Sequence, residues 1–377
     1  MRAASAKYAS YLSLMLLFIG PGQARAENDW YDFRGEVSGW YIFSRDGSEN
    51  YCYMGARYMP RLTLTHELES GNLLDFDISL NAYISASSCE YEEDNELELY
   101  RLNGRYATDL TETRLGLQKI AFGPAYVLRA LMWFDNVDPR DPLGLTDGVY
   151  ALRFIYTGLN NARYWAWVLY GNEDPMGYDY LPTASKVPEF GGRLHYPMLA
   201  GELAATFHYR EVDAPDPLDN FREYRYALDG RWDFAIGLWF ESVVQQQRSG
   251  QLPYQWTKIA TLGGDYTFGI GNGLYFLIEH MALALSEKAA GWDEDRQVSA
   301  CMMNYPMGIS DNLQMIASYL WEDSQFRIFG AWQRTWDDWM LNIAAFHYPP
   351  SSDDGDALQQ TVTGAGYGGR IIISLNH

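Results

Sequence analysis

The stretch from Arg57 to Ser85 constrains the fold of this chain more than any other segment. In its second half, Leu74 and Phe76 alternate with Asp75 and Asp77, and the same pattern continues to the end of the stretch. Successive side chains of a β-strand point to opposite faces, so this pattern predicts a strand with one apolar and one polar face. Each half of the stretch has about the ten residues that a tilted strand needs to cross a bilayer.

Glu69-Ser70-Gly71-Asn72 joins the two halves and contains residues that favour tight turns, so the stretch is predicted to be a β-hairpin. In a soluble sandwich the apolar face would form the core, whereas in a membrane barrel it would face lipid and the polar face would line the interior. Aromatic residues make up 16% of the chain, with 13 Trp and 29 Tyr. Belts of Trp and Tyr at membrane interfaces would account for them, which favours the barrel.

The N-terminus indicates the compartment. Arg2 and Lys7 precede a short apolar run, Tyr11 to Ile19, and Ala24-Arg25-Ala26 follows with small residues at the positions that a signal peptidase recognises. This pattern is typical of a secretory signal peptide. We therefore expect residues 1–26 to be a signal peptide and residues 27–377 to form one outer-membrane β-barrel.

Long and short connections alternate along the rest of the chain, and their number predicts the strand count. The long ones are expected near 46–55, 86–95, 124–147, 172–187, 213–222, 246–255, 286–296 and 349–362; the short ones near 69–73, 108–112, 158–161, 197–200, 231–234, 269–272, 308–312 and 335–338, with a tight link at 322–324. The prediction is an all-β fold, a single transmembrane antiparallel β-barrel of about 18 strands (16–18). The short turns and both mature termini are expected in the periplasm.

Charge and motifs exclude several functions. The formal net charge of −21 argues against binding nucleic acid. None of the six His lies in a hydrolase or metalloprotease motif, so no enzyme, metal site or cofactor is predicted. The acidic connections, such as 353–356, are either simply solvated or bridge to lipopolysaccharide through divalent cations. Outer-membrane lipid and lipopolysaccharide are thus the expected surroundings.

Two of the three cysteines, Cys52 and Cys89, fall in the first two long connections. These connections belong to neighbouring hairpins on the same side of the membrane, and the secretory route is oxidising. A Cys52–Cys89 disulfide is predicted, with two free thiols as the alternative.

Arginine is the informative charged residue, because only five of the 28 basic residues are lysines. Many arginines occupy the polar positions of predicted strands, and a charge facing lipid costs about 2–4 kcal/mol at mid-membrane, so they are expected to point inward. Two interpretations remain open: an arginine–carboxylate network that stiffens the wall, or a basic ladder that guides anionic solutes.

The longest connection, 124–147, is half apolar, unlike the acidic ones, and is therefore expected to fold inward onto the wall. The segment from Arg114 to Tyr156 resembles the third-loop region of Gram-negative porins, and its layout is similar to that of alginate-export-type porins. The resemblance implies an 18-stranded barrel with an arginine-rich interior. Those porins carry Gly-Arg-Gln where this chain has Gly116-Leu117-Gln118, so their substrate is not implied.

These features predict a porin of the bacterial outer membrane that admits small hydrophilic solutes, anionic or saccharide, with 124–147 as the constriction. The alternative is a non-conducting structural or adhesive barrel, and assembly into a homo-oligomer is left open. The residues predicted to line the constriction are Arg101, Arg105, Arg114, Gln118, Asp135, Asp138, Asp141 and Arg153. In this hypothesis the three aspartates of the loop face the wall arginines across a narrow gap, where low-dielectric walls focus the field.

Overall fold

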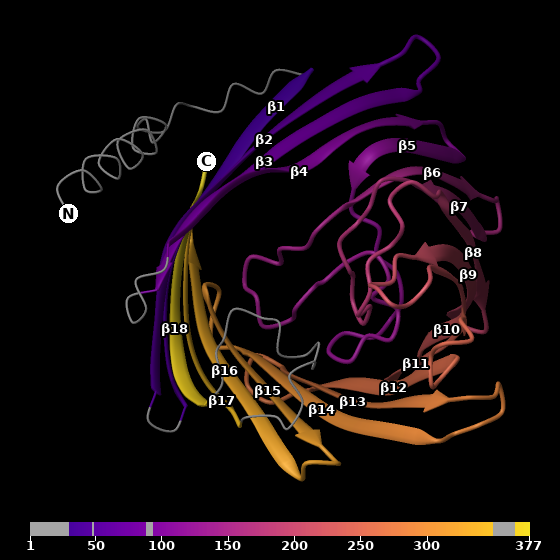
Figure 1. The fold of residues 1–377 in the computed structure, drawn as a ribbon. Coiled ribbons are helices and arrows are strands. Elements are labelled where there is room, and N and C mark those ends of the chain that lie inside the picture. The colour runs from indigo at the N-terminus through magenta and orange to yellow at the C-terminus, as the bar shows by residue number, and fades with distance from the viewer. Residues whose placement is uncertain (1–29, 47–48, 88–92, 350–365) are drawn as a thin grey trace.

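The computed structural model describes residues 30–46, 49–87, 93–349 and 366–377, and these form one closed sheet of 18 antiparallel strands (Figure 1). The predicted number of strands is confirmed. The signal peptide expected at 1–26 and Cys89 lie outside the described residues. The strands are β1 Tyr31–Asp46, β2 Glu49–Glu67, β3 Leu73–Ser87, β4 Glu93–Ala107, β5 Thr111–Gln118, β6 Val149–Thr157, β7 Arg163–Leu169, β8 Glu189–Met198, β9 Gly201–Val212, β10 Phe221–Asp233, β11 Gly237–Arg248, β12 Trp256–Phe268, β13 Leu274–Ser286, β14 Glu294–Pro306, β15 Asp311–Leu320, β16 Gln325–Trp336, β17 Trp339–Tyr348 and β18 Gly366–Asn376.

Each strand pairs with its neighbours in the chain, and β1 closes the barrel by pairing with both β2 and β18. The seam extends to the last residue, because the backbone N–H of His377 donates to the carbonyl of Gly35 and the Gly35 N–H donates back, each at 2.9 Å. The His377 ring stacks on Tyr58 with centroids 5.9 Å apart. The exposed His377 ring therefore has aromatic neighbours, Tyr58 and Phe33, at the seam.

Strand alternation sorts the side chains as the sequence predicts. In β6, Tyr150, Leu152 and Phe154 are exposed on the outside, whereas Ala151 and Arg153 between them are buried toward the interior. Exposed large apolar side chains recur on nearly every strand in this outward register. An outward apolar surface with a charged interior is the pattern of a barrel that sits in a bilayer.

The connections define two ends of the barrel. Turns of two to five residues join β2 to β3, β4 to β5 and each later even-numbered strand to the next strand, so these turns all lie at one end of the barrel. The first residue of β1 and His377 lie at the same end, which we call the short-turn end. The expected long connection at 46–55 is wrong: β2 begins at Glu49, which pairs with Asp46. Tyr51, Cys52 and Tyr53 favour extended backbone and lengthen the hairpin instead.

The longest described connection runs from 119 to 148, between β5 and β6, and lies inside the barrel (Figure 1). β5 ends at Gln118, so the connection begins earlier than the predicted 124. Among the described residues there is no helix long and apolar enough to cross a membrane.

Candidate functional site: the barrel interior

The first half of the 119–148 loop forms a small apolar core against the inner wall. Ile120, Leu128 and Leu131 are almost completely buried, in one cluster with Val243 of β11 and Ile259 of β12. Burial of apolar side chains is favourable by roughly 25 cal/mol per Å², and this interior contact supplies the burial that a loop in water would lack. The loop is therefore held on the β6–β14 side of the interior.

A ring cluster forms the centre of this core. Phe122 stacks on Trp167 of β7 at 5.9 Å, and Phe134 meets the same ring edge-on at 5.7 Å. The indole N–H of Trp167 donates to Nδ1 of His208, 3.2 Å away, so the proton of neutral His208 is on Nε2, which faces Glu189 at 3.1 Å. The ring nitrogens of Trp167 and His208 thereby have partners.

Glu279 of β13 binds the loop backbone directly. Its carboxylate accepts the backbone N–H groups of Tyr126 (2.7 Å), Val127 (2.9 Å) and Leu128 (2.6 Å). It also accepts the indole N–H of Trp239 at 3.1 Å, and its side chain is buried. Hydrogen bonds to a charged group contribute about 1.5–3 kcal/mol each, so this one carboxylate is a strong anchor.

Glu241 of β11 is a second buried carboxylate of the same kind. It accepts the N–H groups of Ala125 at 2.9 Å and Leu131 at 3.0 Å. Thr261 of β12 donates its hydroxyl to the carbonyl of Leu128 at 2.7 Å. The sequence analysis did not identify Glu279 or Glu241. The sequence signal that could have indicated them is a single acidic residue at an inward position of a strand whose outward residues, such as Phe240, are apolar.

A second loop, 170–188 between β7 and β8, also turns inward, which the sequence analysis did not predict. Asp179 in this loop binds Arg225 of β10 at 2.6 Å and Arg210 of β9 at 3.1 Å. Glu223 binds the same two arginines, at 2.6 Å and 2.7 Å. These four residues, the β9–β10 ion cluster, are all at least nine-tenths buried.

The two loops contact each other. The backbone N–H of Gly177 donates to the side-chain oxygen of Asn136 at 2.7 Å. Gly177 has φ of 58°, and a Cβ there would lie 1.8 Å from the carbonyl oxygen of Met132. Only glycine fits this close approach in the left-handed conformation, so the loops pack as one unit.

The far part of the 119–148 loop reaches the opposite wall. Arg370 of β18 donates to the carbonyl of Arg140 at 2.6 Å, and Asp138 binds the Arg140 side chain at 2.9 Å. Burial disfavours the charged form of Arg140, but the Asp138 carboxylate outweighs burial and raises the pKa of the guanidinium above its usual value. The 119–148 loop as a whole thus spans the interior from β11–β13 to β18.

The three predicted aspartates of the loop have local partners. Asp135 is fully buried and binds Arg129 at 2.8 Å, and Asp138 binds Arg140. Asp141 accepts two backbone N–H groups of the following turn, at 3.1 Å and 2.9 Å. The carboxylates therefore stabilise the loop itself, instead of pairing across a gap with Arg101, Arg105, Arg114 and Arg153.

Three of the predicted wall arginines lie together around Glu112. Arg153 binds this carboxylate at 2.7 Å, Arg105 at 3.3 Å and Arg114 at 3.7 Å. The three occupy one row of the sheet, in which Arg105 is paired with Arg114 and Arg114 with Arg153. Arg105 also donates from Nε to Asp75 at 2.6 Å.

The two remaining predicted wall residues lie apart from that row. Arg101 donates to the carbonyl of Thr146 at 2.7 Å and so holds the end of the loop. Gln118 has no exposed surface and donates to the carbonyl of Ala151 at 2.9 Å, within the wall.

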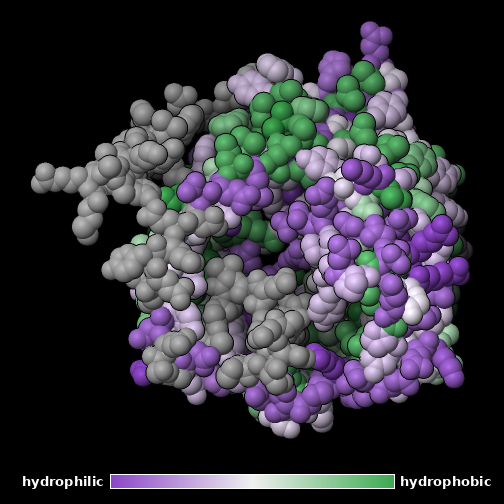
Figure 2. All heavy atoms as spheres, viewed as in Figure 1, coloured by the Kyte–Doolittle hydropathy of each residue, from purple (hydrophilic) through white to green (hydrophobic). Residues whose placement is uncertain are grey.

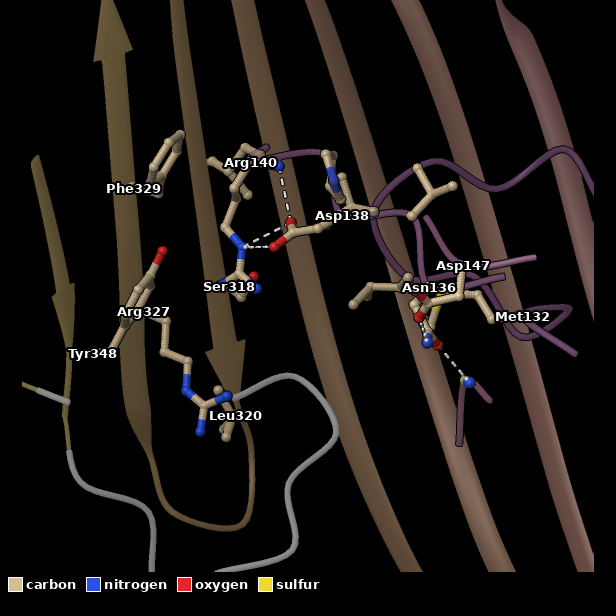
Figure 3. A pocket seen from close by; sticks show the side chains of 16 residues that line it. Met132, Asn136, Asp138, Arg140, Asp147, Ser318, Leu320, Arg327, Phe329 and Tyr348 are labelled. Atoms are coloured by element: carbon tan, nitrogen blue, oxygen red, sulfur yellow. Dashed lines mark hydrogen bonds and ion pairs between the residues drawn. The ribbon is translucent and has the colours of Figure 1, made fainter. Parts of the chain in front are cut away.

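A cavity of about 330 Å³ separates the loop from strands β15–β17. In Figure 3, Arg327, Phe329 and Tyr348 extend from the strands, and Asp138 and Asp147 from the loop. At about 30 Å³ per water molecule, the cavity has room for roughly ten waters. The structure therefore leaves an unfilled cavity beside the loop.

The inner wall on the β2–β4 side is also exposed to solvent. Arg61 faces the interior, where it binds Asp77 at 2.9 Å, yet its side chain is 58% exposed. Glu96 and Glu98 of β4 are exposed as well. Figure 2 shows one end of the barrel, with a hollow near its middle and hydrophilic residues over much of the surface around it. In the part of the chain that the structure describes, no group of three or more His, Cys, Asp and Glu side chains is placed to bind a metal ion.

Comparison with known proteins gives a match in structure only. No family model matches the chain, and no curated protein matches its sequence. The Acinetobacter baumannii protein OccAB1 superposes with a TM-score of 0.58 at 11% identity, over 94% of this chain and 99% of that one. Salmonella typhi OmpF, solved in complex with daunomycin, gives 0.54 at 12% identity, over 92% and 97%. A Comamonas acidovorans anion-selective porin gives 0.52 at 12% identity, over 92% and 99%. At these identities the likeness shows the fold: this chain has the closed antiparallel β-barrel of these porins.

Proposed function

We propose that this protein is a channel of the bacterial outer membrane through which small hydrophilic solutes diffuse, and that the 119–148 loop is its constriction. The observation that carries the proposal is the anchoring of the loop by Glu241 and Glu279 at one wall and by Arg370 at the other. A loop anchored at both walls narrows the interior. It does not fill it, because a cavity lies beside β15–β17 and the inner wall at Arg61 is exposed to solvent. The apolar outer surface fits lipid on all sides.

The charge on the solvent-exposed inner wall formed by β2–β6 suggests the class of solute. On the inward face of β2–β6, the described side chains include six arginines and six carboxylates: Arg57, Arg61, Arg101, Arg105, Arg114 and Arg153, and Glu67, Asp75, Asp77, Glu96, Glu98 and Glu112. Near balance of charge favours polar neutral solutes such as saccharides together with small anions, with weak ion selectivity. The similarity to an anion-selective porin is compatible with a modest preference for anions.

The loop tip offers a direct test of the constriction. The backbone N–H of Asn136 donates to the Thr146 hydroxyl at 2.8 Å, so the two ends of the segment 137–145 lie close together. We expect replacement of 137–145 by a Gly-Ser-Gly linker to raise single-channel conductance in planar bilayers, because the tip no longer crosses to β18. A similar shortening of the exposed connection 213–220 is the control and should leave conductance unchanged. If both variants conduct like the native protein, the tip is not the constriction.

A second prediction concerns the arginine row. We expect Arg105→Ala with Arg114→Ala to shift reversal potentials toward cation selectivity, since Asp75 and Glu112 would then exceed the nearby cations. Arg248 faces outward, over the ring of Tyr224 at 4.9 Å, so Arg248→Ala removes a charge without touching the interior. Equal selectivity in the double variant and this control would contradict a role of the row in ion passage.

One observation favours the alternative of a non-conducting structural barrel. The two inward loops and the wall share an extensive apolar core, and many interior charges are paired. Purified protein in planar bilayers separates the two functions: discrete conductance steps support the channel, and a silent membrane with correctly folded protein supports the structural barrel.

A further inference from the structure

Five consecutive short turns at one end of the barrel carry no charge. These are 158–162, 199–200, 234–236, 269–273 and 307–310, which lie side by side along β6–β15, whereas one residue in five of the whole chain is charged. Each turn instead presents a large aliphatic or aromatic side chain that is more than half exposed: Leu159, Leu199, Phe234, Ile270 and Ile309. We call these five turns the apolar rim.

The other described short turns have the opposite character. Glu69 lies in the β2–β3 turn, Asp109 in the β4–β5 turn, and Asp337 with Asp338 in the β16–β17 turn. The apolar rim thus covers one continuous side of the short-turn end, and charged turns cover the other side (Figure 1).

Polar groups of the 269–273 turn are bonded within the turn or to the neighbouring strand. Ile270 donates its N–H to Phe268, and Gly273 donates to Ile270 at 3.0 Å. The Asn272 amide donates to the carbonyl of Pro306 in the neighbouring strand at 3.0 Å. The charged neighbours Arg231 and Asp265 pair with each other at 3.1 Å on the inner face. Backbone groups that are bonded internally can leave bulk water at little cost.

Strand length gives an independent reason for placing the short-turn end of this side of the barrel within the apolar part of the membrane. β6, β7 and β8 have 9, 7 and 10 residues, whereas β1–β4 have 16, 19, 15 and 15. At about 3.3 Å per residue, β7 is roughly 23 Å long, and less in height when tilted. The apolar band of such barrels is about 25 Å tall, so β7 does not reach beyond both edges of it, and at least one of its ends meets lipid. Beyond the far end of β7 the chain carries the charged Glu173 and Asp174, whereas the turn before β7 is uncharged and exposes Leu159, so this turn is the end that favours lipid.

We propose that the apolar rim is immersed in the lipid of the adjacent leaflet, at the boundary between headgroups and acyl chains, and that the barrel sits asymmetrically in the bilayer. The rim is continuous with the outward apolar surface, through residues such as Phe268 and Leu238, and the same lipid covers both. Its side chains are spread along a row of five neighbouring turns, which fits a laterally continuous partner such as lipid better than a peptide.

The test measures contact with acyl chains directly. In a background with Cys52→Ser, Cys89→Ser and Cys301→Ser, an environment-sensitive fluorophore is attached at Phe234→Cys, Ile270→Cys or Ile309→Cys in phosphatidylcholine vesicles. Lipids brominated high on the acyl chain should quench these three severalfold more than Ser70→Cys, with Leu228→Cys on the outer wall as positive control. Quenching no stronger than at Ser70→Cys overturns the proposal, and quenching in detergent-free vesicles excludes cover by another protein.

A second readout needs no cysteine background. Phe234→Asp, Ile270→Asp and Ile309→Asp should each lower the yield of insertion into vesicles severalfold, with folding in detergent unchanged, whereas Ser70→Asp should insert normally. Native yield in all three would contradict immersion. Neither readout depends on conduction, so failure of the proposed channel function leaves this test intact.

Discussion

Replacement of Glu279 by alanine is expected to release the 119–148 loop from the wall and to raise single-channel conductance severalfold. The carboxylate accepts three consecutive backbone N–H groups and one indole N–H in a buried site. Each donor left without a partner costs about 1–3 kcal/mol. Three of the four donors belong to the loop, so the variant weakens the hold of the wall on residues 126–128, and this part of the loop should sample positions away from β11–β13.

Planar-bilayer recordings give the measurement, and two variants serve as controls. Glu202→Ala removes a carboxylate from the inner wall that binds His195 and not the loop, so its conductance should stay native. Glu279→Gln retains one acceptor oxygen and should fall between the native protein and Glu279→Ala. Native conductance in Glu279→Ala, with the barrel folded, would mean that this anchor does not control the width of the channel.

The barrel itself could be predicted from the sequence because its signals are local. Alternation along each strand sets which side chains face outward, and turn residues mark where one strand ends, as at Gly71 between β2 and β3. The failure at 46–55 has a local cause as well: a polar, aromatic segment fits a loop and an extended hairpin equally, and pairing of Glu49 with Asp46 decides between them.

The interior could not be predicted in the same way, because its contacts join distant parts of the chain. Glu279 meets residues 126–128 across about 150 positions, and Asp179 meets Arg225 across 46. Inward folding of 124–147 was inferred from its apolar composition, but composition says nothing about which wall residues receive it. The 170–188 loop is polar, and no property of its sequence marks it as an inward loop.

The aspartates of the loop illustrate a second limit. A carboxylate in a predicted constriction can face the channel or stabilise its own loop, and the residue type is the same in both cases. Arg129 lies six residues before Asp135, and Arg140 lies two residues after Asp138. The two aspartates form ion pairs with these neighbours in the sequence. In the proposed channel, an electric field across the interior would therefore come from charges that have no ion-pair partner within the loop, such as Asp147 and the wall arginines.

The second large effect is expected at the β9–β10 ion cluster. Arg225→Met keeps the length and apolar stem of the side chain but removes its charge, leaving Glu223 and Asp179 with Arg210 alone. Removing one partner from a buried ion pair costs about 3–5 kcal/mol, because the remaining charge stays buried without compensation. We expect a loss of this size in the free energy of unfolding by urea, together with faster proteolysis within 170–188, which Asp179 anchors.

Two further variants separate loss of charge balance from loss of packing. Arg231→Met should cost no more than about 1 kcal/mol, since Arg231 is one-third exposed near the short-turn end and its ion pairs are solvated. Adding Glu223→Gln to Arg225→Met returns the cluster to one cation and one anion, Arg210 and Asp179, and should recover part of the stability. If the double variant is no more stable than Arg225→Met, the arginine acts through the space that it fills, and the buried charges contribute little to holding the inward loops.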